Sequence, residues 1–211
     1  MINHIVFDID GTLVDSSSLL LSTLKEIARR YTPQVPAEKD LYSMWYGKTG
    51  DECIKALGVE PRFRAEALQQ WCDLIVQEAN NTTVAFEGIL DMFEQLEAKN
   101  ITCSCATSRD DRIADYGLKH AGILRYCSAL VSAGMTEHAK PHPDPILLCT
   151  ELCDAQLEHT LFIGDAHTDY EAAQAAGIPF AFAGWNPQAT PFECEHHLTH
   201  PHEVLDLIAS L

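Results

Sequence analysis

Basic residues are scarce in this chain of 211 residues. Fourteen lysines and arginines stand against 31 aspartates and glutamates, which gives a formal net charge of −17. Nucleic-acid binding needs a basic face and docking on anionic membranes needs basic clusters, so this balance argues against both. A small anionic substrate is still allowed, because local charges and backbone amides can override the net charge.

Long apolar runs and paired-cysteine motifs are also absent. No run approaches the ~20 residues of a membrane span, and the start lacks the charged stretch and apolar run of a signal peptide. The eight cysteines form no C-x-x-C pair, and a chain that is 46% apolar does not need a disulfide framework. We therefore expect reduced, mostly core-filling thiols in a cytoplasmic protein.

Short apolar runs alternate with helical patterns along most of the chain. The runs predict buried strands over 4–9, 101–106, 128–133, 160–165 and 179–183. The helical patterns between and after them cover 87–100, 110–122, 143–153, 168–177 and 201–211. This alternation predicts an α/β fold with a doubly wound, Rossmann-like parallel sheet.

One segment departs from this alternation. Between 16 and 83 the sequence has helical patterns, over 19–31, 51–57 and 63–81, and no convincing strand. We therefore predict two domains: an α/β core of residues 1–15 and 84–211, and a helical cap of residues 16–83 on the carboxyl edge of the sheet.

Polar residues follow four of the predicted strands, where a doubly wound sheet collects its chemistry. They are Asp8, Asp10, Gly11 and Thr12, then Thr107, Ser108 and Arg109, then Lys140, and finally Asp165 and Asp169. Several carboxylates in one crevice repel one another unless a hard cation such as Mg²⁺ binds them. A threonine hydroxyl, a lysine and turn amides suit a phosphate, so the set favours phosphoryl transfer.

Four stretches of this sequence resemble the four motifs of the haloacid dehalogenase superfamily. They are "DIDGTLVD", "ATSR", "KPHPDP" and "GDAHTDYEAAQAAG", in that order, and the resemblance covers nearly the whole chain. The sequence is most similar to the phosphoglycolate phosphatase and β-phosphoglucomutase branch, which carries a helical cap after the first motif. The resemblance implies a Mg²⁺-dependent enzyme acting on small phosphate esters, with no nucleic acid or membrane partner, as a monomer or weak homodimer.

The resemblance also implies roles for single residues. Asp8 is expected to be the nucleophile and a metal ligand, and Asp10 the general acid and base, with its backbone carbonyl on the metal. Asp165 is expected to bind the metal and Asp169 to support it. The expected phosphate contacts are Gly11, Thr12, Thr107, Ser108 and Lys140.

Some residues keep a second interpretation. Thr107 or Ser108 could instead cap a helix starting at Asp110, and Asp169 could simply favour the first turn of its helix. Arg109 would contact the substrate or lie at the surface. Lys48, in a glycine-led stretch similar to the family's specificity loop, would contact an anionic substrate or only solvent.

The sequence favours a phosphatase over three alternatives. A β-phosphoglucomutase-like phosphomutase shares the motifs, but phosphomutases of that branch resemble one another in a cap arginine beside the specificity loop, and here that place is Lys48-Thr49. A dehalogenase would lack Asp10, and a non-catalytic relative would have lost a motif residue. The histidine-rich stretch 194–204 could hold zinc or form a strand, loop and helix. The substrate, whether phosphoglycolate, a sugar phosphate, a nucleotide or pyrophosphate, is left open.

Overall fold

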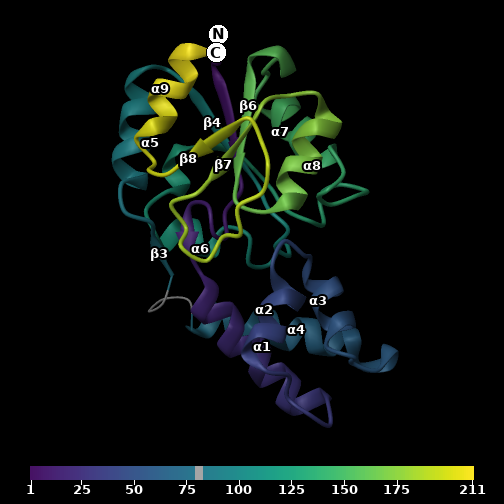
Figure 1. The fold of residues 1–211 in the computed structure, drawn as a ribbon. Coiled ribbons are helices and arrows are strands. Elements are labelled where there is room, and N and C mark those ends of the chain that lie inside the picture. The colour runs from purple at the N-terminus through teal and green to yellow at the C-terminus, as the bar shows by residue number, and fades with distance from the viewer. Residues whose placement is uncertain (79–82) are drawn as a thin grey trace.

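A six-stranded parallel sheet forms the centre of the molecule (Figure 1). The computed structural model describes residues 1–78 and 83–211. The strands are β1 (His4–Phe7), β4 (Thr102–Ala106), β5 (Cys127–Val131), β6 (Thr160–Gly164), β7 (Phe180–Ala183) and β8 (His196–Leu198). Their order is β5-β4-β1-β6-β7-β8, so β1 lies between β4 and β6. The predicted doubly wound α/β fold is confirmed.

Helices cover both faces of the sheet (Figure 1). They are α5 (Ile89–Ala98), α6 (Tyr116–His120), α7 (Asp144–Leu152), α8 (His167–Ala176) and α9 (Glu203–Ser210). Alternate residues of β1 point to opposite faces, as a strand requires. Ile5 and Phe7 pack in the apolar cluster that contains residues of α5 and α9. Val6 packs in the cluster that contains residues of α7 and α8.

Four further helices form a separate unit at the end of the core opposite the two chain termini (Figure 1). They are α1 (Ser17–Tyr31), α2 (Glu38–Trp45), α3 (Gly50–Ala56) and α4 (Arg64–Glu78). Their buried residues form an apolar cluster of their own, which Ile113 of the α/β core joins. The chain enters through β2 (Val14–Asp15) and returns through β3 (Val84–Ala85), and these two strands pair antiparallel.

Several predicted elements differ in extent from the observed ones. The helix predicted over 110–122 is confined to α6, because residues 111–115 form turns. The helix predicted over 63–81 begins at Arg64 after a 3₁₀ turn (Pro61–Phe63), and its residues 79–81 lie outside the described part. In α5, the buried side chains are Ile89, Met92, Phe93 and Leu96, whereas Leu90 is exposed.

In the described part of the chain, the short helix α2 and the short strands β2 and β3 were not predicted from the residues. The two strands have two residues each, too few to show an alternating pattern. The histidine-rich stretch forms β8, a turn and the start of α9. Among the described residues it contributes to no cluster of metal-ligating side chains. Nor does any helix in the described part have the length and apolarity to cross a membrane.

Candidate active site

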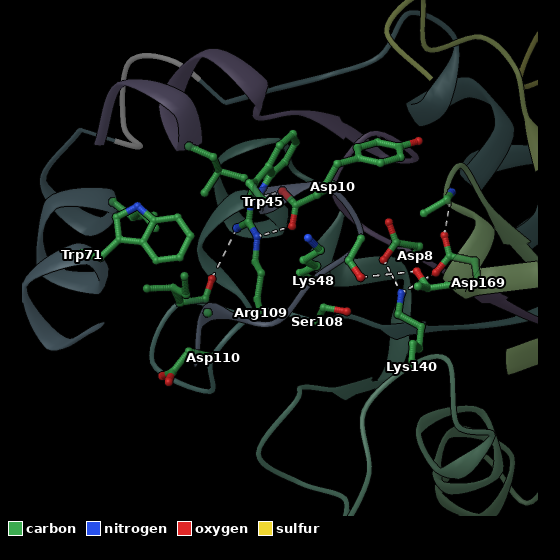
Figure 2. A pocket seen from close by; sticks show the side chains of 18 of the residues that line it. Asp8, Asp10, Trp45, Lys48, Trp71, Ser108, Arg109, Asp110, Lys140 and Asp169 are labelled. Atoms are coloured by element: carbon green, nitrogen blue, oxygen red, sulfur yellow. Dashed lines mark hydrogen bonds and ion pairs between the residues drawn. The ribbon is translucent and has the colours of Figure 1, made fainter. Parts of the chain in front are cut away.

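Three buried carboxylates meet at the carboxyl edge of the sheet (Figure 2). Asp8 directly follows β1, Asp165 directly follows the neighbouring β6, and Asp169 lies in the first turn of α8. One oxygen of each lies within 4.8 Å of the others. The backbone N–H of Asp8 still donates to the Ile163 carbonyl, at 2.9 Å, so the ladder fixes Asp8 beside the end of β6.

Gly11 leaves the space that this cluster needs. Its φ is +86°, a value that side chains with a Cβ rarely adopt. A Cβ at this position would lie 2.1 Å from Oδ2 of Asp165. Glycine is therefore required both by the turn after β1 and by the carboxylate packed against it.

Lys140 links two of the carboxylates. Its Nζ donates to Oδ1 of Asp8 at 2.6 Å, to Oδ1 of Asp169 at 2.7 Å and to the Ala106 carbonyl at 3.0 Å. The side chain is almost fully buried and comes from the loop between β5 and α7. Lys140 therefore lies in the acidic crevice, and its contact with phosphate stays a prediction.

Burial strongly shifts the protonation of these groups. It raises the pKa of Asp8 to about 7, with Lys140 opposing the shift and the carboxylate of Asp169 adding to it. Burial, and then the charges of Asp8 and Asp169, also raise the pKa of Asp165. For Lys140, burial alone would lower the pKa, but Asp169 and Asp8 raise it above its usual value. The carboxylates are thus crowded beyond what one lysine neutralises.

Asp165 is held by side chains that the sequence analysis missed. Tyr46 donates its hydroxyl to the Asp165 carbonyl at 2.6 Å and to Oδ2 at 3.1 Å, and Asn186 donates to Oδ2 at 2.9 Å. Asn186 follows β7, so the strand-end rule applied to the fifth predicted strand would have found it. Tyr46 comes from the helical unit and gave no such signal.

Thr12 also contacts Asp165. Its buried hydroxyl donates to Oδ1 at 3.3 Å, which places it on the carboxylate side of the crevice. The sequence analysis placed Thr12 among the phosphate contacts, and that role stays a prediction.

Asp10 pairs with Arg109 instead of joining the three-carboxylate cluster. Arg109 Nε donates to Oδ2 at 2.6 Å, and its second nitrogen, Nη2, donates to Oδ1. Ser16 also donates to Oδ1 of Asp10. Arg109 is buried, so the surface position weighed for it is wrong. Although burial lowers the pKa of its guanidinium, the charge of Asp10 more than offsets this and raises it.

The remaining predicted residues lie around the same crevice. Thr107 is buried and its hydroxyl accepts the Arg109 N–H at 3.1 Å, with no helix starting at Asp110 for it to cap. Ser108 and Lys48 line the cavity over the carboxylates. Lys48 is exposed, and its Nζ donates to the Ser43 carbonyl at 3.0 Å. The structure thus brings all the predicted residues to one region.

The donor set fits a hard divalent cation. The carboxylates of Asp8, Asp10, Asp165 and Asp169 face two buried cations, Lys140 and Arg109. When all are ionised, negative charge is in excess. Carboxylate oxygens are the ligands that hard cations such as Mg²⁺ prefer. Proteins usually bind Mg²⁺ through one or two carboxylates together with phosphate groups of the substrate.

Comparison with known proteins identifies relatives along nearly the whole chain. A family model described as haloacid dehalogenase-like hydrolase matches residues 5–183. Pyrophosphatase PpaX of Oceanobacillus iheyensis is 26% identical over 197 residues, which cover 93% of this chain and 90% of that protein.

Solved structures share the fold. CbbY from Rhodobacter sphaeroides, in complex with phosphate, has a TM-score of 0.85 at 19% identity, over 97% of this chain and 96% of that one. A hydrolase of the same superfamily, subfamily IA, from Geobacter sulfurreducens has a TM-score of 0.71 at 22% identity, over 98% and 96% of the two chains.

Proposed function

This chain belongs to the haloacid dehalogenase-like hydrolases, and we propose that it is a Mg²⁺-dependent phosphatase that hydrolyses a small phosphate monoester. The observation that carries the proposal is the surroundings of Asp8. Its carboxylate lies between Lys140 and the carboxylates of Asp165 and Asp169, at the edge of a cavity. The relatives named as pyrophosphatases act on a phosphate compound, which supports the same chemistry here.

Asp8 would act as the nucleophile. One carboxylate oxygen forms a bond to phosphorus while the bond from phosphorus to the ester oxygen breaks, which leaves an aspartyl-phosphate and an alcohol. Lys140 fixes the Asp8 carboxylate and offsets charge on the phosphoryl oxygens. Mg²⁺ held by Asp8, Asp165, Asp169 and the backbone carbonyl of Asp10 would supply further positive charge against these oxygens.

Asp10 would move the proton. It gives a proton to the leaving ester oxygen, then takes one from the water that hydrolyses the aspartyl-phosphate and regenerates Asp8. Both Asp10 oxygens accept from Arg109 in this structure. We therefore propose that Arg109 orients Asp10 and releases one oxygen when the substrate enters.

The phosphate contacts follow from the same arrangement. The proposed contacts to the phosphoryl group are Thr107, Ser108 and the turn at Gly11 and Thr12. The sequence-based expectation that Arg109 and Lys48 contact the substrate stays a prediction. We also propose that residues 16–83 are a cap domain on the core of residues 1–15 and 84–211, which the separate apolar cluster of the helical unit supports.

The experiment is phosphate release from p-nitrophenyl phosphate, with Mg²⁺ and again after EDTA. We expect release with Mg²⁺, its loss in EDTA and its return when Mg²⁺ is added back. Release that is unaffected by EDTA would contradict the metal requirement, and no release in either condition would contradict the phosphatase proposal. With β-glucose 1-phosphate, a phosphatase yields free phosphate whereas a phosphomutase yields glucose 6-phosphate.

A further inference from the structure

The cavity over Asp8 has a second end whose wall is apolar. It extends from the carboxylates, past Arg109, into the helical unit (Figure 2). Its wall there is formed by Leu20 of α1, Trp45 of α2, Leu68, Trp71 and Ile75 of α4, and Ile113 of the core. The three α4 residues are spaced by three and four, so they share one face of that helix.

Polar groups at this end already have partners. The indole N–H of Trp71 donates to the hydroxyl of Thr23 at 3.0 Å, inside the helical unit. The guanidinium of Arg109 is neutralised by Asp10. Lys48 is exposed to solvent. The surface that this wall presents to the cavity is therefore mainly apolar.

This wall constrains the part of the substrate that leaves with the ester oxygen. A second phosphate or a carboxylate would lose its hydrating water against these apolar side chains, which costs free energy. None of the wall residues named above is an unpaired buried cation that could offset this cost. An apolar group would instead gain from burial there, and an aromatic ring would also match the rings of Trp45 and Trp71.

We infer that the substrate is a phosphate monoester whose alcohol carries an apolar group, best an aromatic ring, seated against Leu68 and Trp71. This inference rests on the proposed function, because it places the phosphate at Asp8 and the alcohol at the apolar end. It disfavours pyrophosphate and 2-phosphoglycolate, whose leaving groups are anionic.

The first test compares kcat/KM of the full chain with Mg²⁺ for benzyl phosphate, ethyl phosphate, 2-phosphoglycolate and pyrophosphate. We expect benzyl phosphate to exceed each of the others at least tenfold. Any smaller ratio, or a preference for one of the anionic leaving groups, overturns the inference.

A pair of variants tests the location. Leu68 and Leu74 both lie on α4, half-buried and packed against the same apolar cluster, but only Leu68 lines the cavity. Leu68→Asp is expected to lower the ratio of kcat/KM for benzyl phosphate to kcat/KM for ethyl phosphate at least tenfold. Leu74→Asp is expected to leave the ratio of kcat/KM for the two substrates unchanged. Equal ratios in the two variants would contradict the assigned wall.

Binding without turnover separates this inference from the proposed function. The probes are benzylphosphonate and ethylphosphonate, titrated calorimetrically into the full chain with Mg²⁺. We expect the aromatic phosphonate to bind at least tenfold more tightly, and the difference to disappear in Leu68→Asp. If no ester is hydrolysed but this difference is measured, the phosphatase proposal fails and the apolar site stands. If esters are hydrolysed but the two phosphonates bind alike, the apolar site fails alone.

Discussion

Two aspartates separated by one residue have different surroundings. Asp8 is buried beside Asp165 and Asp169 and is bonded by Lys140, whereas Asp10 is bonded by Arg109. The end of β1 places both aspartates in the crevice. Their different partners fit the different roles proposed for them, attack on phosphorus by Asp8 and proton transfer by Asp10.

Replacing the proposed nucleophile by its amide tests this division. Asp8→Asn keeps the shape of the side chain but removes the charge that attacks phosphorus, so we expect phosphate release to fall at least about a hundredfold. The exposed Asp154→Asn serves as the control and should leave the rate unchanged. Activity in Asp8→Asn near that of the parent would contradict the assignment.

His4 predicts a dependence of stability on pH. It is fully buried between the hydroxyls of Ser104 and Thr160, and burial lowers its pKa from 6.5 to about 4. Between pH 6.5 and pH 4 the unfolded chain therefore binds a proton on His4 more readily than the folded chain does. The contribution of neutral His4 to the free energy of unfolding is thus complete above pH 6.5 and is lost as the pH falls toward 4. The loss amounts to about 2–3 kcal/mol.

Chemical denaturation at pH 7 and pH 4.5 measures this loss. Because carboxylates also titrate in this range, the comparison is with His4→Gln, which keeps a hydrogen-bonding side chain without the proton equilibrium. Between pH 7 and pH 4.5, the free energy of unfolding of the parent should fall by about 2–3 kcal/mol more than that of the variant. Equal losses would show that His4 does not contribute.

At the level of elements, the turn after β1 is fixed by contacts to β6 and beyond. Gly11 packs against the Asp165 carboxylate, and Trp185 donates its indole N–H to the Thr12 carbonyl at 2.8 Å. The turn and the end of the neighbouring strand thus form one rigid piece, and a change in the turn should reach the carboxylate cluster.

A matched pair of glycines tests that coupling. Gly11 and Gly58 have φ of +86° and +80°, but a Cβ at Gly58 would meet nothing within 4 Å. Alanine at Gly58 should cost only the backbone term of about 1 kcal/mol and leave activity intact. Gly11→Ala should cost more and reduce phosphate release at least tenfold, because its Cβ displaces Asp165. Thermal unfolding and phosphate release report the two effects, and similar losses in both variants would contradict the packing argument.

On the scale of the whole molecule, the site is completed by two units. The core supplies the carboxylates and Lys140, while the helical unit supplies Tyr46 to Asp165 and most of the apolar wall. In return, Ile113 of the core packs into the apolar cluster of the helical unit. The contact between the units is therefore also the place where the proposed substrate would be enclosed.

Metal binding should raise the stability of the whole chain. Mg²⁺ bound at the proposed site would relieve the repulsion among Asp8, Asp165 and Asp169, and a ligand that binds only the folded state stabilises that state by mass action. We expect Tm to rise by a few degrees in millimolar Mg²⁺ and to return in EDTA. In Asp165→Asn the rise should be much smaller. An equal rise in that variant would place the binding elsewhere.

The sequence by itself determined the sheet, most of its helices and the crevice residues. Strand and helix periodicities are local patterns, and parallel strands necessarily bring their carboxyl ends together, so Asp8 and Asp165 could be placed before any coordinates. Only the tertiary structure decided which side chains bind the carboxylates of the crevice. Tyr46 and Arg109 reach partners 119 and 99 positions away in the chain. The Tyr46 pairing depends on how the two units pack, and the Arg109 pairing depends on how the loop after β4 meets the turn after β1, so no local spacing in the sequence records either of them.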